Sequence, residues 1–530
     1  MRKQIIKFLF LLLAFGYAME AKSGEFTVDG IRYYYTNEDD DEVSVTYSSS
    51  GKYSGNIVIP STVTYNGKQY TVTKIGTGAF RDCTGLTAVT LPNAMTSIGR
   101  NAFRDCTGLT TVTISNSVTS IGSYAFYGCT GLTEVTIPNA VTSIGSSAFS
   151  GCTGLTEVTI PNAVTSIGSR AFSGCTGLTE VTIPNAVTYI GERAFEGCSG
   201  LTTVTIGNSV TTIEERAFTS CSGLTTVIWN ARNAEYYNGL SYDSPFSNCD
   251  RLTDFVFGEE VEHIPALLCC ELASLKNLVI GNSVTSIGIS AFDGCSGLTE
   301  VIWNARNVQD FQDNSSRPFS GCDRLTDFVF GEEVEHIPDY LCYQLTSLNT
   351  IVIPNSVTSI GTNAFSFCSG LKTVTIPNSV TNIGSSAFED CTELKTVTIG
   401  NSVTDIGDEA FSSCFNLTEV SIPNSVTSIG DEAFYFCTDL KTVTIGNSVK
   451  SIGDKAFYHC SSLEHVTSKA VTPPQIWAMT FDDYGMPFYV PAGCKPKYAE
   501  AEYWNNFTDI RETGVTLHTV TANATDETMG

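Results

Sequence analysis

The sequence predicts a solenoid, a fold in which the chain winds through many similar turns that stack on one another. The main observation is a phenylalanine that recurs every 23 residues along most of the chain, for example at Phe80, Phe103 and Phe126. Between these anchors, cysteine, leucine, valine and isoleucine recur at constant positions, so that each period supplies one layer of apolar side chains. Such layers are stable only when stacked, and this moves the search for function from a pocket to a surface.

One period shows what each turn must bury. Phe103 is followed by Cys106, Leu109, Val112 and Ile114. The last three have the spacing of a short strand whose alternate residues face inward, whereas the segment that ends at Cys106 has the compactness of a single helical or 3₁₀ turn. Proline, asparagine and glycine recur at the corners, where they favour turns. We therefore predict parallel β-strands joined by short helical or 3₁₀ turns, in about 17 rungs of 23 residues.

The two ends of the chain lack this period. Arg2 and Lys3, an apolar stretch over residues 8–15, and a cleavage position after Ala18 or Ala21 are typical of a secretory signal peptide, so we expect export. No later stretch reaches the roughly 18 apolar residues needed to span a bilayer. The predicted organisation is a signal peptide (1–21), an N-terminal β cap of hairpins (22–74), the solenoid (75–466), a C-terminal cap (467–513), and a tail (514–530) that resembles the start of a truncated β-repeat.

The repeat itself resembles a known family. Residues 121–145, IGSYAFYGCTGLTEVTIPNAVTSIG, are similar to the leucine-rich repeat of the BspA-like surface proteins of bacteria and trichomonads. The resemblance implies a right-handed leucine-rich-repeat solenoid and a cell-surface role in adhesion to host proteins, matrix proteins or other microbes. Asn116 stands seven residues after Leu109, one earlier than the usual asparagine-ladder position, so a standard asparagine ladder is not assumed.

Charge and motifs exclude several functions. The net charge of −26 argues against nucleic acid and anionic membranes as partners, because both require a basic face. The acidic run 38–42 is either a calcium site or, as we favour, a solvated hairpin loop. His263 and His336 follow Glu262 and Glu335 in identical contexts, but three rungs, roughly 14 Å at strand spacing, separate them, which is too far to share a metal ion. With no catalytic, phosphate-binding or dinucleotide motif, we expect no enzyme, no cofactor and no metal site.

The cysteines form part of the repeat. Of the nineteen, fifteen stand three residues after the anchor position, from Cys83 to Cys460, on the side of the chain that faces the core. A column of this kind gives each thiol one neighbour above and one below, so it specifies no unique disulfide pairing. Although exported proteins often carry disulfides, we favour free thiols that pack as small apolar side chains.

The outward face of the strands changes character in one region. Most rungs carry threonine at the central outward position, but a duplicated three-rung unit over residues 224–360 carries isoleucine or valine there, and each of its copies has an insertion that follows the sequence VIWNARN. An exposed apolar stripe must be covered either by these insertions or by a partner. The candidate partner-binding surface comprises Ile228, Trp229, Tyr236, Tyr237, Tyr242, Val256, Val279, Ile302, Trp303, Phe311, Val329 and Val352.

These observations, together with the family resemblance, suggest an exported surface protein that mediates adhesion or protein–protein interaction with host, matrix or microbial partners. The alternative is a carbohydrate-binding or glycan-utilisation accessory protein, which would use exposed aromatic rings as platforms for sugars. Trp229 and Trp303 discriminate between the two, since exposed indoles favour glycan binding and inward ones favour a structural role.

Overall fold

The computed structural model describes residues 23–36, 39–48, 51–237, 244–313 and 315–514. Contacts within the chain divide it into two compact units, residues 1–274 and 275–530, and each unit is described by itself. The predicted signal peptide and all but the first residue of the predicted tail lie outside the described residues. Within the described ranges, no helix is both long and apolar enough to cross a membrane.

The first unit opens with antiparallel strands. β1 (Gly24–Val28) pairs with β2 (Ile31–Tyr35), and β5 (Thr62–Tyr65) pairs with β6 (Lys68–Ile75). β3 (Glu42–Val45) lies between β2 and β6 and runs parallel to β6, which leads into the repeats. Here the alternating sequence forms hairpins, as predicted.

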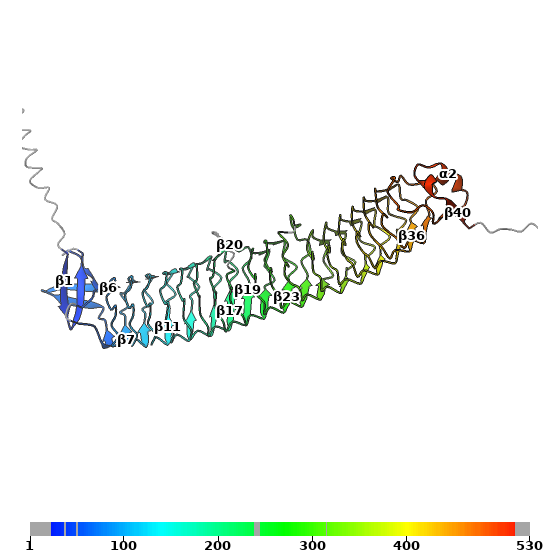
Figure 1. The fold of residues 1–530 in the computed structure, drawn as a ribbon. Coiled ribbons are helices and arrows are strands. Elements are labelled where there is room, and N and C mark those ends of the chain that lie inside the picture. The colour runs from blue at the N-terminus through cyan, green and yellow to red at the C-terminus, as the bar shows by residue number, and fades with distance from the viewer. Residues whose placement is uncertain (1–22, 37–38, 49–50, 238–243, 314, 515–530) are drawn as a thin grey trace, which may run out of the picture. The chain divides into compact units, whose positions relative to one another are not determined.

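The repeats of the first unit form two columns of parallel strands, stacked as Figure 1 shows. Each strand pairs with the one a period later, so that the central residues Val135 and Val158 are partners. The first column contains β4 (Gly55–Val58), β7 (Leu86–Thr90), β9 (Thr111–Thr113), β11 (Glu134–Thr136), β13 (Glu157–Thr159), β15 (Glu180–Thr182), β17 (Thr203–Ile206), β19 (Thr226–Trp229) and β21 (Asp254–Phe257). The second contains β8 (Ser97–Ile98), β10 (Ser120–Ile121), β12 (Ser143–Ile144), β14 (Ser166–Ile167), β16 (Tyr189–Ile190), β18 (Thr212–Glu214), β20 (Glu235–Tyr237) and β22 (His263–Ile264).

The second unit repeats this arrangement. Its first column contains β23 (Asn277–Ile280), β25 (Glu300–Trp303), β26 (Asp327–Phe330), β28 (Thr350–Val352), β30 (Thr373–Thr375), β32 (Thr396–Thr398), β34 (Glu419–Ser421), β36 (Thr442–Ile445), β38 (His465–Ser468), β39 (Pro487–Pro491) and β40 (Asp509–Thr513). Its second column contains β24 (Ser286–Ile287), β27 (His336–Ile337), β29 (Ser359–Ile360), β31 (Asn382–Ile383), β33 (Asp405–Ile406), β35 (Ser428–Ile429) and β37 (Ser451–Ile452). The predicted fold class, a solenoid of parallel strands, is confirmed.

The last turns of the second unit are closed by aromatic side chains. Helix α2 (Lys495–Glu500) and the 3₁₀ helix η1 (Trp504–Asn506) lie between β39 and β40 in the chain. The buried ring of Trp504 stacks on Phe488 at 4.8 Å and meets Tyr498 edge to face at 5.3 Å. These rings cover the last layer of the solenoid, which has no following rung to pack against.

A column of phenylalanine rings runs through the core of each unit. In the first unit, Phe149 and Phe172 stack with ring centroids 5.3 Å apart, and Phe172 and Phe195 with centroids 5.2 Å apart, all three fully buried. In the second unit, Phe388 and Phe411 stack at 5.3 Å in the same way. The anchor that recurs in the sequence therefore forms a stack of rings in each unit, interrupted in the second unit by Cys342 between Phe319 and Phe365.

The cysteines form a second buried column beside the rings. All nineteen are free and buried. In rung after rung the thiol donates a hydrogen bond to the backbone carbonyl of the anchor in the preceding rung; for example, Cys175 bonds Phe149 and Cys198 bonds Phe172, with Sγ to O distances of 3.1 and 3.2 Å. Desolvation by burial raises the pKa of Cys152 and Cys198 to about 12. In these rungs the thiol is thus a second donor to a buried carbonyl that already accepts a backbone amide, a bond that alanine could not make.

The segment at each anchor is a run of tight turns instead of a continuous helix. Two residues of most such segments, four positions apart, have left-handed backbone, such as Asn101 at φ 54° and Asp105 at φ 57°. The amide of Phe103 donates to Ala125 of the next rung at 2.7 Å, whereas that of Cys106 closes a turn onto Phe103 at 3.2 Å. The expected helical or 3₁₀ turn therefore keeps only every second local bond, because the other amides are needed to join neighbouring rungs.

Single asparagine bonds join two corners where a Pro-Asn corner is followed by a Gly-Asn corner. The amide of Asn208 donates to the side-chain oxygen of Asn185 at 3.1 Å, and the amides of Asn401 and Asn447 donate to Asn378 and Asn424 in the same way. A Cβ at Gly207 would lie 2.6 Å from the carbonyl oxygen of Pro184, so only glycine permits this close approach of the two corners. Each bond joins one pair of rungs, which differs from a standard asparagine ladder.

Candidate functional site

The predicted apolar column is present in the first unit. Ile228 on β19 pairs with Thr205 on one side and with Val256 of β21 on the other. Ile228 is half-buried, and Val256 is 49% exposed. The change from threonine to an apolar side chain therefore takes place in register on the outward face of this sheet.

The column in the second unit is longer. Val279, Ile302, Val329 and Val352 are successive partners on β23, β25, β26 and β28. Val279 is 45% exposed, Val329 46% and Val352 79%, while Ile302 is half-buried. The insertion of this unit therefore leaves most of its apolar column open to solvent, and Val256 shows the same for the first unit.

Acidic residues border the apolar column. Asp254, Glu300 and Asp327 stand two positions before Val256, Ile302 and Val329 on their strands. Because alternate residues of a strand share a face, each carboxylate lies on the outward face beside the apolar side chain. In each unit the outward face thus combines an apolar strip with an acidic margin.

Three of the predicted surface residues are buried and do not belong to this surface. Trp229 and Trp303 are fully buried, and Phe311 is only 6% exposed. Each indole lies on the inward face of its strand, together with the valine two residues earlier. Trp229 contacts Phe255, and Trp303 contacts Phe328. Neither indole nitrogen has a hydrogen-bond partner among the described residues, and both rings pack as apolar side chains. By the criterion set above, inward indoles favour the structural role over a glycan platform.

The tyrosines of the first insertion are only partly described. The backbone of Tyr236 and Tyr237 lies in β20, paired with Ile213 and Glu214 of β18. Tyr242 lies outside the described residues. Their part in a binding surface stays a prediction.

The insertion of the second unit is tied down by polar contacts that the sequence did not indicate. Nε2 of His336 lies 2.7 Å from Oδ1 of Asp310, and Nδ1 lies 2.7 Å from Oγ of Ser359. Oδ1 of Asp310 also accepts the backbone amide of Asp339 at 3.0 Å, and the Arg306 guanidinium pairs with Glu335 at 2.6 Å. Burial opposes ionisation of Asp310, but its bonds to His336 and Asp339 outweigh this and lower its pKa.

Asp310, His336 and Ser359 follow the order of a hydrolase triad, but their geometry differs. In a hydrolase triad Nε2 faces the serine and Nδ1 the aspartate, the reverse of the arrangement here. Ser359 also lies inside the parallel ladder between β27 and β31. The contacts are therefore a tether that holds the insertion against the second column of strands.

The glutamates beside the two histidines are also engaged. Glu262 pairs with Arg232 in the first unit, and Glu335 pairs with Arg306 in the second. The hydrogen bond from Arg232 lowers the pKa of Glu262. Among the described residues, no group of three or more histidine, cysteine, aspartate or glutamate side chains could hold a metal ion.

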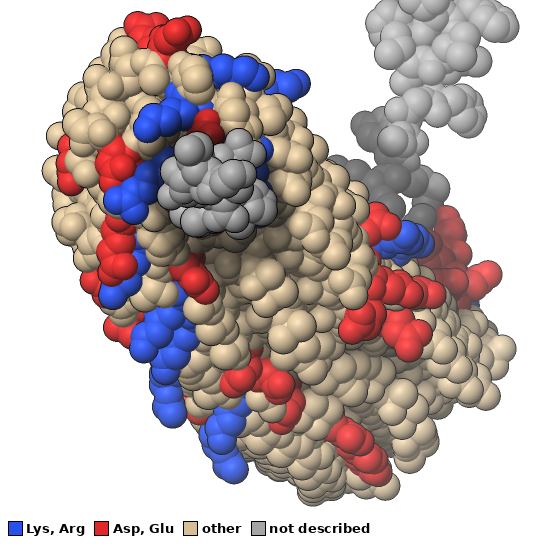
Figure 2. All heavy atoms as spheres, turned by 90° about the vertical axis from the view of Figure 1, so that its right-hand side faces the viewer, with Lys and Arg blue, Asp and Glu red and all other residues tan. Residues whose placement is uncertain are grey.

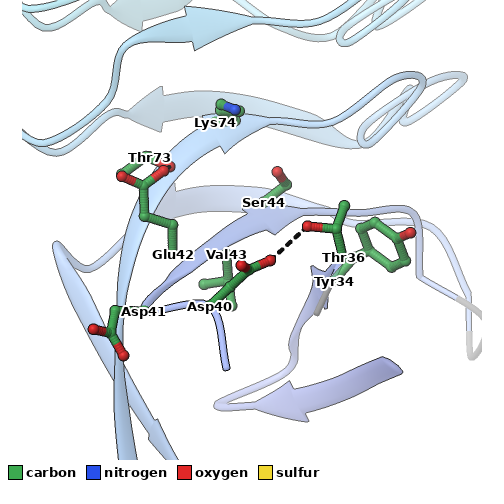
Figure 3. A pocket seen from close by; sticks show the side chains of 9 residues that line it. All are labelled: Tyr34, Thr36, Asp40, Asp41, Glu42, Val43, Ser44, Thr73 and Lys74. Carbon is green, nitrogen blue, oxygen red and sulfur yellow. Dashed lines mark hydrogen bonds between the residues drawn. The ribbon is translucent and has the colours of Figure 1, made fainter. Parts of the chain in front are cut away.

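The acidic run near the N-terminus lines a hollow between β2, β3 and β6, shown in Figure 3. Its carboxylates point apart: Asp40 accepts from Thr36 at 2.5 Å, Glu42 accepts from Thr73 at 3.0 Å, and Asp41 pairs with Lys68 at 3.4 Å. Because each described carboxylate has its own partner, they do not converge as calcium ligands do.

One cluster escaped the sequence analysis. Tyr435, Phe436, Tyr458 and His459 form a group of four mutually contacting rings at the turn edge of the second unit. The signal was present in the sequence, since Tyr435-Phe436 and Tyr458-His459 belong to consecutive rungs with aromatic rings at both positions after the anchor, where most other rungs carry at most one.

The fold and the repeat define a leucine-rich-repeat solenoid. The family model described as the BspA type leucine rich repeat region matches residues 56–176, 142–265, 241–372 and 335–464, and the chain belongs to this family. This confirms the resemblance found in the sequence.

Solved structures with the same repeat are similar over most of their length. A leucine-rich repeat protein from Bacteroides ovatus is 25% identical, with 83% of this chain and 94% of that chain covered and a TM-score of 0.42. A leucine rich cell surface protein from Faecalibacterium prausnitzii is 27% identical, with 84% and 95% covered and a TM-score of 0.30. The pneumococcal vaccine antigen PcpA is 16% identical, with 93% and 99% covered and a TM-score of 0.33. The comparison with curated proteins found no match.

Proposed function

We propose that this chain is an exported cell-surface protein that binds an extracellular protein through the apolar columns on its outward sheet faces. The observation that carries the proposal is the exposure of Val256, Val279, Val329 and Val352, which the insertions leave open. Such contiguous apolar side chains on a solvated sheet are costly in water and are typical of protein-binding surfaces. Adhesion to host, matrix or microbial proteins is the role that the family and the predicted signal peptide favour.

The acidic margin restricts the partner. Asp254, Glu300 and Asp327 flank the column, and the whole chain carries a net charge of −26. A partner that combines an apolar ridge with basic groups is complementary to this surface, since opposite charges steer association and disfavour acidic proteins. Nucleic acid does not fit.

The test compares the wild type with the triple variant Ile302→Thr/Val329→Thr/Val352→Thr, which places in the second unit the residue that most other rungs carry. Val471→Thr is the matched control, because Val471 is also exposed but stands outside the column. Binding is measured to immobilised matrix proteins and to a glycan array. We expect the triple variant to lose at least tenfold in affinity for its protein partner and to unfold at nearly the wild-type temperature.

Full binding by the triple variant would contradict the proposal. A markedly lower unfolding temperature of the triple variant would mean that the column stabilises the fold and is not a free surface. Binding that occurs only on the glycan array would favour the carbohydrate-binding alternative, for which the buried Trp229 and Trp303 provide no platform.

A further inference from the structure

We propose that the four-ring cluster of Tyr435, Phe436, Tyr458 and His459 binds a guanidinium or ammonium group of a basic peptide segment. The site lies in the second unit, on turns outside the outward sheet, so the inference goes beyond the proposed function and does not depend on it.

The rings pack closely in two consecutive rungs. The Tyr435 and Tyr458 rings are nearly parallel, with centroids 6.3 Å apart. Phe436 meets the Tyr435 ring edge to face at 4.6 Å, and the imidazole of His459 lies 4.4 Å from both Phe436 and Tyr458. Phe436 is 36% exposed and the other three are partly exposed, so the cluster is open to solvent.

Two of these rings stand at a left-handed position of the turn. Phe436 and His459 have φ of 58° and 61°. The other rungs use the same conformation at this position, with residues as different as Gly294 at φ 71° and Asp390 at φ 53°, so the conformation belongs to the fold and does not by itself mark a site. Bulky side chains adopt it at some cost, which the ring contacts offset in part.

Elsewhere the chain shows what such tyrosines bind. In the first unit, the Arg104 guanidinium lies over the ring of Tyr127, 4.9 Å from its centroid, and in the second unit Arg317 lies over Tyr343 at 5.0 Å. In each case the arginine comes from the preceding rung. The rung before Tyr435 carries Ser412 at the position of Arg104 and Glu409 at the position of Arg317, and among the described residues no cation lies over the rings of Tyr435 and Tyr458.

Carboxylates surround the cluster. Glu409 and Glu432 stand on the same turn edge, and Asp482 accepts the backbone amide of His459 at 2.6 Å. Burial, together with repulsion from Glu432 and Asp408, raises the pKa of Glu409. The nearby Lys455 is held by Glu432 at 2.7 Å.

Figure 2 shows acidic side chains interspersed with basic ones on the face at this end of the chain. Ring faces and carboxylates both attract a cation and repel an anion, which distinguishes this ligand from phosphates and acidic sugars.

The test uses two short peptides, one with two arginines separated by glycine and serine, the other with citrulline in place of each arginine. Citrulline keeps the shape and removes the charge. Binding is measured with the full chain and with the variant Tyr435→Ser/Phe436→Ser/Tyr458→Ser, which copies the serines that the preceding rung already carries. The control is Tyr124→Ser/Tyr127→Ser, whose rings are already covered by Arg104.

We expect the wild type to bind the arginine peptide at least tenfold more tightly than the citrulline peptide, the triple variant to lose this preference, and the control to keep it. Phe436→Gly is a second variant that relieves the left-handed strain, so it should fold at least as well as the wild type and still bind more weakly.

Equal affinity for the two peptides, or full binding by both variants, would overturn the inference. So would tyrosine-dependent binding of a neutral oligosaccharide without binding of the arginine peptide. The stripe variant Ile302→Thr/Val329→Thr/Val352→Thr should bind the arginine peptide normally, so failure here and failure of the proposed function are separable.

Discussion

Replacing Phe172 with alanine tests how locally the layers depend on one another. Its ring is fully buried between Phe149 and Phe195, with centroids 5.3 and 5.2 Å away and interplanar angles of 6° and 9°. The variant Phe172→Ala removes both stacks at once. The neighbouring rings cannot close the gap easily, because backbone bonds between rungs hold them in place, such as the 2.8 Å bond from the amide of Phe172 to Ala194.

The expected cost follows from these contacts. Truncating a buried phenylalanine costs about 3–5 kcal/mol. Each aromatic pair contributes about 0.5–1.5 kcal/mol beyond the buried area. Since two parallel pairs are lost in a site that relaxes poorly, we expect about 4–5 kcal/mol, nearly all of it at this layer, because each repeat contacts only its neighbours.

Native-state hydrogen exchange measures this cost at each amide. Because every 1.4 kcal/mol changes an equilibrium tenfold, amides of residues 149–195 should exchange about a thousandfold faster in Phe172→Ala. Amides around Phe103 and those of the second unit should change little. Thr182→Ala, an exposed position on β15, serves as control and should have no such effect. Unchanged protection over residues 149–195, or an equal loss along the whole chain, would refute the argument.

Three other predictions concern the columns and corners. Burial raises the pKa of Cys152 and Cys198 to about 12, so these thiols stay protonated in the folded state, whereas unfolded thiols ionise near pH 9. The free energy of unfolding should therefore be highest below pH 9 and fall as the pH rises toward 12. Denaturant melts at a series of pH values would show this decrease. Protein unfolded without reductant should titrate with a thiol reagent as mostly free cysteine, whereas nearly complete oxidation would contradict a thiol core. Gly207→Ala should lower the free energy of unfolding by roughly 1–3 kcal/mol, because its Cβ would meet the Pro184 carbonyl at 2.6 Å. The control Gly281→Ala, whose Cβ would have nothing within 4 Å, should be neutral. Equal effects of the two variants on the melting temperature would disprove the close approach.

The periodic parts of the structure were predictable from the sequence. The spacing of Phe172, Cys175 and their equivalents identified the core columns, and the register of Ile302 with Val329 followed from the same count. This works because each rung packs only against its neighbours, so contacts in space translate into a fixed separation along the chain. The four-ring cluster at Tyr435 and Tyr458 follows from the same count, because its side chains stand one and two residues after the anchors of two consecutive rungs.

The insertions and the fine geometry of the turns required the tertiary structure. Phe311 is buried and Asp310 reaches His336 because the insertion folds back over the second column of strands, and no period in its sequence encodes that path. The hydrogen bond from each cysteine to the preceding phenylalanine depends on the orientation of one thiol in three dimensions. Local repetition determines which residues stack, whereas non-repeating segments take the conformation that best buries their apolar side chains and satisfies their polar groups, and this depends on the surface they meet.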